Sequence, residues 1–247
     1  MRLSGSNKKR FRQSLFKQED MKINYAIITK TGKRSNNEDA VKVIQPDDKS
    51  RWTGIVCDGM GGHAMGETAS LTVAESIAEY WIDTETAPDT EEKVIKACKK
   101  AGVALNKKAH TFSNAEMGTT MVMASLDEDT LTVAHIGDSR CYLQRPGEGV
   151  LYRTADHIGL SFGWEIVTRC FFSFKPEIAI PETMQFKVKS GDRILLCTDG
   201  VYKSMSPEIL MARMMDEKSP ADILDVFDFL CEKNGDDNYT AILAIIE

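Results

Sequence analysis

The hydrophobic positions along the chain follow two different periods. Ala69, Val73, Ile77 and Trp81 recur every four residues within Gly66–Ile82, as on one face of a helix. The same period predicts a helix over Glu91–His110, and two further helices are predicted over Ser206–Asp216 and Ser219–Asn234. In the last two, a serine before a proline supplies a cap residue ahead of the first helical position.

The remaining apolar segments are short and rich in β-branched residues, which is typical of strands. The predicted strands are Lys22–Thr29, Ala40–Ile44, Trp52–Cys57, Thr119–Leu126, Thr130–Ile136, Cys141–Arg145, Val150–Thr154, Gln185–Val188, Asp192–Thr198 and Tyr239–Ile246. The links D-E-D, G-D-S-R, P-G-E-G and K-S-G have the composition of hairpin turns. These features predict an α+β fold, in which antiparallel sheets are covered by helix pairs. Because residues 21–247 contain no linker, we expect them to form one domain.

Charge divides the chain into two parts. The 247 residues carry 31 Lys and Arg against 37 Asp and Glu, a net charge of −6. Residues 1–20 hold six basic and two acidic side chains, which leaves −10 for the rest. Such an acidic body argues against nucleic-acid binding, and no apolar run reaches the roughly 20 residues of a membrane span. We expect residues 1–20 to be a basic, disordered arm; a contact with a membrane surface or a partner is the alternative.

The six cysteines contain no C-x-x-C pair, which argues against a zinc ribbon or a redox pair. Cys57, Cys141 and Cys197 lie inside predicted strands. We therefore expect buried, reduced thiols in a cytoplasmic protein.

Acidic residues stand beside glycines at the ends of predicted strands. Asp58, Asp199 and Asp237 each border an apolar strand, where a carboxylate is held rigidly while its head reaches solvent. Several such strand ends together would form an all-oxygen site, which suits Mg²⁺, Mn²⁺ or Ca²⁺. Taken singly, each segment also fits an ordinary Asp-Gly turn. The four glycines within Gly59–Gly66 favour a site, because such density suggests a close backbone approach.

The order of eight short motifs carries a resemblance. R-S-N-N-E-D, D-G-M-G-G-H-x-x-G-E-x-A-S, G-T-T, G-D-S-R, D-H, V-T-R, T-D-G and D-D-N-Y-T follow one another along the chain. In this order they resemble the metal-dependent protein phosphatases of type 2C, and the second motif is similar to the bacterial branch. The resemblance spans about residues 24–246. It implies two packed antiparallel sheets flanked by helix pairs, and hydrolysis of phosphoserine and phosphothreonine in proteins.

The resemblance also implies a site with two Mn²⁺ or Mg²⁺ ions. Asp58 would bridge both ions and the Gly59 carbonyl would bind one of them. Asp199 and Asp237 would complete the other, while Glu38 and Asp39 would act largely through bound water. A water activated by both cations would attack phosphorus. Arg34 would hold the phosphate oxygens, because its planar fork pairs with two of them.

A third metal site is doubtful. Asp138 matches a family position linked to a third, weaker ion, although the same residue could simply tighten a turn. The family often has an acid four residues after the T-D-G aspartate, where this chain has Lys203. An ammonium group there should repel another cation.

The identity of the general acid stays open. Animal members have a histidine where this chain has Met60. His63 is near in sequence and is a candidate general acid and substrate-binding residue. The alternatives are that His63 is only a loop histidine and that a metal-bound water donates the proton.

Two segments differ from relatives in length or composition. The stretch between Asp156 and Arg169, where relatives have a longer flap, is short. We therefore expect an open cleft with weak discrimination among phosphopeptides. Arg169–Lys175 is unusually aromatic, which fits either core packing or an exposed docking patch.

Together these features predict a cytoplasmic, monomeric phosphatase of phosphorylated proteins that opposes a cognate Ser/Thr kinase. Two alternatives remain: a non-catalytic regulatory module of the same fold, and a phosphatase of a small phosphoester. The presence of Arg34 and of the acids Asp58, Asp199 and Asp237 favours an enzyme, because the resemblance implies that degenerate members lose the acids.

Overall fold

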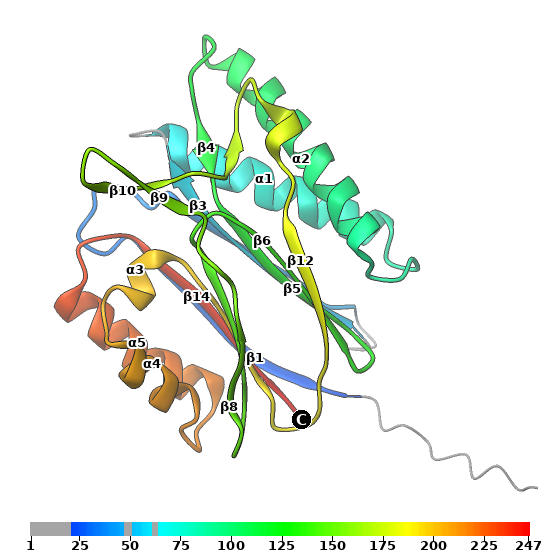
Figure 1. Ribbon diagram of the computed structural model, residues 1–247, viewed down its shortest axis with the longest axis vertical. Coiled ribbons are helices and arrows are strands. Elements are labelled where there is room, and N and C mark those ends of the chain that lie inside the picture. The colour runs from blue at the N-terminus through cyan, green and yellow to red at the C-terminus, as the bar shows by residue number, and fades with distance from the viewer. Residues whose placement is uncertain (1–20, 47–50, 61–63) are drawn as a thin grey trace, which may run out of the picture.

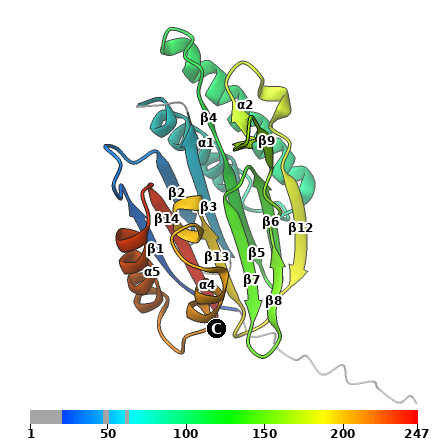
Figure 2. The same cartoon turned by 60° about the vertical axis from the view of Figure 1, so that its left-hand side comes forward.

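Two antiparallel sheets form the centre of the molecule, as seen in a computed structural model that describes residues 21–46, 51–60 and 64–247. The first sheet has five strands in the order β1-β14-β13-β7-β8 (Figure 2). Its strands are β1 (Ile23–Lys30), β14 (Tyr239–Ile246), β13 (Arg193–Cys197), β7 (Arg140–Arg145) and β8 (Gly149–Arg153).

The second sheet has seven strands in the order β11-β4-β3-β5-β6-β12, with β2 also paired to β3. Its strands are β2 (Asp39–Ile44), β3 (Arg51–Met60), β4 (Gly118–Thr119), β5 (Met121–Asp127), β6 (Thr130–Ile136), β11 (Phe171–Phe172) and β12 (Glu182–Lys187). A separate hairpin is formed by β9 (Ile158–Ser161) and β10 (Trp164–Val167).

The helices cover the outer faces of both sheets (Figure 1). The helices α1 (Ala64–Asp83) and α2 (Glu91–Thr111) pack on the seven-stranded sheet. The five-stranded sheet is covered by α3 (Asp199–Tyr202), α4 (Pro207–Met214) and α5 (Pro220–Asn234). A 3₁₀ turn, η1, spans Pro176–Ile178.

Three apolar clusters separate these four layers. One lies between α1, α2 and the seven-stranded sheet, and includes the predicted helix face Ala69, Val73, Ile77 and Trp81. The second lies between the two sheets, and the third lies between the five-stranded sheet and α3–α5. The predicted α+β architecture of packed antiparallel sheets flanked by helices is therefore confirmed.

Two of the four predicted hairpins are wrong. β5 pairs with β6, and β7 pairs with β8, as expected from their links. The G-D-S-R link instead carries the chain from β6 in one sheet to β7 in the other, and the K-S-G link does the same between β12 and β13. Turn residues reverse the chain equally well within a sheet and between two sheets, so composition could not separate the two cases.

The predicted serine caps are present. Ser206 accepts a hydrogen bond from the Ile209 N–H, and Ser219 accepts one from the Asp222 N–H. Each cap satisfies a backbone donor that the first turn of a helix leaves without a partner.

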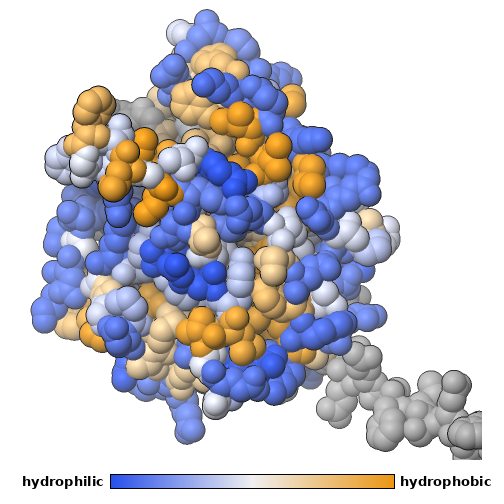
Figure 3. All heavy atoms as spheres, viewed as in Figure 1, coloured by the Kyte–Doolittle hydropathy of each residue, from blue (hydrophilic) through white to orange (hydrophobic). Residues whose placement is uncertain are grey.

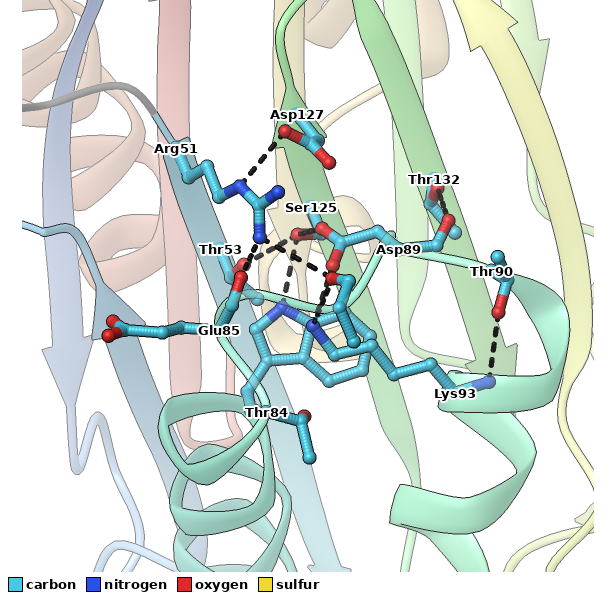
Figure 4. Close-up of polar contacts among 12 residues, drawn as sticks. Arg51, Thr53, Thr84, Glu85, Asp89, Thr90, Lys93, Ser125, Asp127 and Thr132 are labelled. Atoms are coloured by element: carbon cyan, nitrogen blue, oxygen red, sulfur yellow. Dashed lines mark hydrogen bonds and ion pairs between the residues drawn. The ribbon is translucent and has the colours of Figure 1, made fainter.

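A buried ion pair closes the link between α1 and α2 (Figure 4). Lys93 Nζ lies 2.8 Å from Asp89 Oδ1, and both side chains are at most 5% exposed. Ser125 Oγ donates to the other Asp89 oxygen, and Trp81 Nε1 donates to Ser125 Oγ at 3.2 Å. The Lys93 ammonium also lies 4.2 Å from the Trp81 ring centre. The pair is thus satisfied on both sides, as a buried charge requires.

The aromatic segment is divided between core and surface. Phe171 is fully buried against α1 and α2, which supports core packing for this residue. Phe174 is 39% exposed and its ring contacts His110 edge-on, with ring centres 5.3 Å apart.

Within the described ranges, no helix combines the length and apolar character that a membrane crossing requires. Residues 1–20, which we expect to be a disordered arm, lie outside these ranges. The assignment of residues 21–247 to one domain stays a prediction.

Candidate active site

The ends of strands from both sheets meet at one polar cavity of about 280 Å³. Its lining contains seven of the predicted site residues: Arg34, Glu38, Asp58, Gly59, Asp138, Asp199 and Asp237. The remaining lining residues are Met60, Thr120, Glu165, Val167, Lys203 and Asn238.

Asp58 is fixed by the neighbouring strands of the seven-stranded sheet. Its N–H donates to Thr120 Oγ1 at 3.0 Å, and its carbonyl accepts from the Thr120 N–H at 2.9 Å. The Thr119 hydroxyl donates to the same carbonyl at 2.8 Å. These bonds anchor the backbone on both sides, so the carboxylate projects from a rigid support.

Asp39 lies directly opposite Asp58 across the β2–β3 pair. It is not among the residues that line the cavity. The Thr198 hydroxyl, from the other sheet, donates to its Oδ2 at 2.9 Å. Asp39 therefore forms a layer behind the wall and joins the two sheets.

Gly59 and Gly66 allow the backbone of β3 and α1 to approach Glu38 closely. A Cβ at Gly59 would overlap the Gly66 carbonyl, and a Cβ at Gly66 would overlap the Glu38 carboxylate. The Gly59 N–H donates to the Glu38 carbonyl at 3.1 Å, and the Ser70 hydroxyl donates to it at 2.6 Å. The close approach expected from the glycine density is thus an approach of α1 to the end of β3.

The second sheet supplies the opposite wall. Asp199 begins α3 directly after β13, and Asp237 precedes β14, the neighbour of β13. Asn238 fastens this wall to the first one, since its side-chain amide donates to the Thr31 and Asn36 carbonyls at 2.8 Å each. Its Oδ1 accepts from the Glu38 N–H at 2.9 Å.

Two basic side chains face the carboxylates. Arg34 Nη2 lies 2.9 Å from Asp237 Oδ2, and the Arg34 side chain is 58% exposed. Lys203 Nζ lies 2.6 Å from Asp199 Oδ2. Each of these aspartates is therefore neutralised by one cation of the protein, while Asp58 has no such partner among the described residues.

Crowding of the carboxylates changes their acidity. Burial raises the pKa of Asp58 well above its usual range, and the charges of Asp39 and Asp199 raise it further. Burial likewise raises the pKa of Asp39 to about 7, against hydrogen bonds from Thr240 and Thr198 that lower it. The pKa of Asp138 rises to about 6 through burial and the Asp199 charge, although Lys203 opposes the rise.

Among the described residues, one group of three side chains brings possible metal-ligand atoms within 4.8 Å of one another. This group lies outside the cavity. It consists of His135, His157 and Glu182. Arg169 Nη1 already lies 2.6 Å from Glu182 Oε1 and 3.0 Å from His157 Nε2, so a cation of the protein pairs with this group. The cavity carboxylates in the part of the chain that the structure describes do not form such a group of three.

The fold thus brings predicted site residues from five separate segments of the chain into one cavity. The one predicted site residue that cannot be placed is His63, which lies outside the described residues. Thr120 and Asn238 belong to the quoted motifs G-T-T and D-D-N-Y-T, and their anchoring role was missed.

Glu165 and Val167 were missed as well. They reach the cavity on β10, and their sequence neighbours carry no turn or acid pattern that would have marked them. The short segment between Asp156 and Arg169, expected to leave the cleft open, forms the β9–β10 hairpin at the cavity rim.

Comparison with known proteins places this geometry in a family. Residues 30–241 match the sequence profile of the family described as protein phosphatase 2C. The chain is 29% identical over 236 residues to the serine/threonine phosphatase Stp of Listeria innocua, a match that covers 85% of this chain and 90% of that protein. It is 28% identical over 227 residues to the serine/threonine protein phosphatase PstP of Mycobacterium tuberculosis, and covers 42% of that longer protein.

The fold has close counterparts among solved structures. The catalytic domain of PstP, crystallised with two manganese ions, superposes with a TM-score of 0.77 at 27% identity, over 92% of this chain and 99% of that one. A phosphatase from S. agalactiae, at 23% identity and a TM-score of 0.80, shares the fold. From the matched motifs, the shared architecture and the extent of the profile match, this chain belongs to the protein phosphatase 2C family.

Proposed function

We propose that this chain is a metal-dependent phosphatase that hydrolyses phosphoserine and phosphothreonine in proteins. The observation that carries the proposal is the meeting of Asp58, Asp199 and Asp237 with Arg34 in one cavity. Oxygen donors on two facing walls and an exposed guanidinium beside them are what a phosphate monoester and its metal ions require. Membership of the protein phosphatase 2C family, and the printed names of Stp and PstP, support the same activity.

Arg34 is the proposed phosphate-binding residue. Its planar guanidinium can pair with two phosphate oxygens and stays charged at any physiological pH. The 2.9 Å contact with Asp237 holds the side chain at the cavity edge, and its 58% exposure leaves other donors open to a ligand. Arg34 would thus orient the phosphate before hydrolysis.

The donor set fits two Mn²⁺ or Mg²⁺ ions. We propose that Asp58, Asp199, Asp237 and the Gly59 carbonyl hold them, with Glu38 and Asp39 acting through water. The fit rests on donor chemistry, since hard divalent cations prefer carboxylate and carbonyl oxygens. It also rests on the raised pKa of Asp58, whose burial among other acids calls for positive charge. When bound, such ions would supply Lewis-acid chemistry by acidifying water and neutralising phosphate charge.

A third cation is not part of the proposal. Asp138 lies in the cavity wall, but the Lys203 ammonium lies 2.6 Å from Asp199, on the side where a third ion would need carboxylate oxygens. We propose that Lys203 supplies the positive charge there.

The partners follow from the reaction. We propose phosphorylated proteins as substrates, a Ser/Thr kinase acting in the opposite direction, and a monomer working in the cytoplasm. The net charge of −6 supports the absence of a nucleic-acid partner, because phosphate backbones are bound by clustered Lys and Arg.

The test compares wild type with Asp58→Asn and Asp199→Asn on p-nitrophenyl phosphate and on a phosphothreonine peptide. We expect turnover with Mn²⁺, its loss in EDTA, and a decrease of at least about 1,000-fold in kcat for both variants. Lys99→Gln, at an exposed position on α2, is the control for purification and should match wild type. Full activity in EDTA would exclude the metal mechanism. Turnover of the small ester without any release from phosphopeptides would favour a small phosphoester as the substrate.

A further inference from the structure

The β9–β10 hairpin presents large apolar side chains to solvent beside the cavity. Leu160 is 79% exposed and Phe162 is 101% exposed; we call these two residues the flap apolar surface. Trp164, which is 77% exposed, lies on the other face of the hairpin, because it is opposite Ser161 while Leu160 is opposite Glu165. Figure 3 shows apolar atoms gathered at the upper left, where Figure 1 places this hairpin. Such a cluster is unusual on a free surface and marks a place where another molecule binds.

The hairpin has no second layer of its own. It forms a separate two-stranded sheet, so its side chains do not continue either of the large sheets. Within the described residues, Leu160, Phe162 and Trp164 belong to none of the three apolar clusters. Their exposure is thus not explained by packing inside the molecule.

The turn at the tip of the β9–β10 hairpin has a backbone conformation that is unfavourable for Phe162. Phe162 and Gly163 form a two-residue turn with φ of 51° and 85°. Such turns favour Asn, Asp or Gly at both positions, because a left-handed backbone is unfavourable for a bulky side chain. A phenylalanine that is both strained and fully exposed has no structural reason to be there, which points to a functional one.

The base of the hairpin is fastened to the body. The His157 N–H donates to the Gly137 carbonyl at 3.0 Å, and the Gly137 N–H donates back to His157 Nδ1 at 3.0 Å. The Thr168 N–H donates to the His157 carbonyl at 2.8 Å. Arg169 donates to the Ile180 carbonyl and to Glu182. The base of the hairpin that carries the flap apolar surface is therefore anchored beside Gly137, the residue before Asp138.

The strand register joins this surface to the cavity. Leu160 lies opposite Glu165, and Ile158 lies opposite Val167. Residues opposite each other in an antiparallel pair share a face, and Glu165 and Val167 line the cavity. Leu160 therefore continues the cavity wall outward, with Phe162 beyond it at the tip.

We propose that the flap apolar surface binds a large apolar side chain of the phosphoprotein substrate, a few residues from the phosphorylated one. The inference rests on the proposed function. A peptide whose phosphate lies in the cavity must leave over its rim, and residues two apart in an extended chain are about 7 Å apart. The Glu165 carboxylate on the same face disfavours an acidic residue at that place. Binding there would give a preference among phosphopeptides, in contrast to the weak discrimination expected from the short flap.

Two pairs of phosphothreonine peptides test the proposal. Within a pair, the two peptides differ only in having Leu or Asn at one position. That position lies three residues before the phosphothreonine in one pair and three residues after it in the other. For wild type with Mn²⁺, we expect kcat/KM to favour the leucine peptide about 10-fold in at least one pair, mainly through KM. Leu160→Ser and Phe162→Ser should each reduce that ratio to about 2-fold or less. Phe229→Ser removes a 62% exposed aromatic residue on α5 and should keep the wild-type ratio.

The outcomes separate the two proposals. A wild type that hydrolyses p-nitrophenyl phosphate but treats both peptides of each pair alike overturns the docking inference and leaves the proposed function intact. Equal ratios in wild type and both hairpin variants overturn it as well. A wild type without any phosphatase activity overturns the proposed function itself. Sedimentation and binding to phosphatidylserine vesicles test two other occupants of this surface. If Leu160→Ser abolishes a dimer or vesicle binding while the peptide ratio stays unchanged, the surface binds a second copy of the chain or a membrane. The inference is then wrong.

Discussion

Lys203 Nζ lies 2.6 Å from Asp199 Oδ2, one turn further along the short α3 segment. Burial lowers the pKa of Lys203, but the hydrogen bond and charge of Asp199 raise it by more, so the ammonium form is favoured. A positive charge of the protein thus lies at the position where the family resemblance led us to expect an acid.

Replacing Lys203 by aspartate should create a third metal site. The variant exchanges a repelling charge for an oxygen ligand beside Asp138 and Asp199. We expect titration calorimetry to detect two Mn²⁺ ions per chain for wild type and three for Lys203→Asp, with the third affinity raised about 100-fold or more over wild type. Lys99→Asp makes the same charge change at an exposed position on α2 and should leave the number at two. A third ion of equal affinity in wild type would show that Lys203 does not exclude it.

The metal-free protein should lose stability as the pH rises. The pKa of Asp39 is about 7 in the folded chain against 3.8 in an unfolded one, so the folded state binds more protons between these values. Stability from this group is therefore present below about pH 4 and is lost as the pH approaches 7. Thermal unfolding in EDTA, compared between wild type and Asp39→Asn from about pH 5 to pH 7.5, measures the effect. We expect a fall in Tm for wild type that is smaller in the variant; parallel curves would contradict it.

Gly59→Ala should damage the fold at the site. A Cβ there would overlap the Gly66 carbonyl and approach the Glu38 carbonyl to 2.6 Å, and both are backbone atoms that cannot rotate away. We expect a loss of about 2 kcal/mol or more in the free energy of unfolding by urea, together with weaker Mn²⁺ binding.

Gly102→Ala is the matched control. Its Cβ would lie 3.1 Å from the Pro176 carbonyl oxygen, and the change improves helix propensity by about 1 kcal/mol inside α2. The two effects oppose each other, so stability should change by less than about 1 kcal/mol. Equal losses in the two glycine variants would mean that the contact at Gly59 is not special.

Asp89→Asn should strongly destabilise the chain. The variant leaves the buried Lys93 ammonium without its counter-charge and weakens the bond from Ser125 (Figure 4). Breaking a buried pair on one side typically costs about 3 to 5 kcal/mol, which urea unfolding can measure. Glu92→Gln removes the carboxylate of an exposed pair at the same i, i+4 spacing, with Lys96, and should have no measurable effect. A small loss for Asp89→Asn would indicate that water enters and solvates Lys93.

The sequence allowed the layers to be predicted because each layer has its own period. The four-residue repeat of Ala69, Val73, Ile77 and Trp81 reports one buried helix face, and all four residues are buried. The site was predictable for the same kind of reason, since acids next to glycines stand where buried strands end. Both signals are local in the sequence, and the fold only has to bring them together.

What could not be predicted depends on contacts between distant segments. Nothing local distinguishes the link from β12 to β13, which crosses between the sheets, from the link between β7 and β8, which does not. Glu165 reaches the cavity because His157 and Gly137 anchor its hairpin, a relationship between residues 20 positions apart. The pair between Arg34 and Asp237 joins residues 203 positions apart and likewise has no local sign.

The pairing of β1 with β14 determines which sheet can be completed first while the chain is being synthesised. Ile23 lies opposite Ile246, and β14 lies between β1 and β13 in the five-stranded sheet. A nascent chain therefore cannot complete this sheet until β14 has left the ribosome, whereas all strands of the seven-stranded sheet and the helices α1 and α2 are synthesised earlier. Closing so long a loop is entropically costly and slow. Until then Asp58 lacks part of its opposite wall, so the cavity can assemble only after β14 has been synthesised.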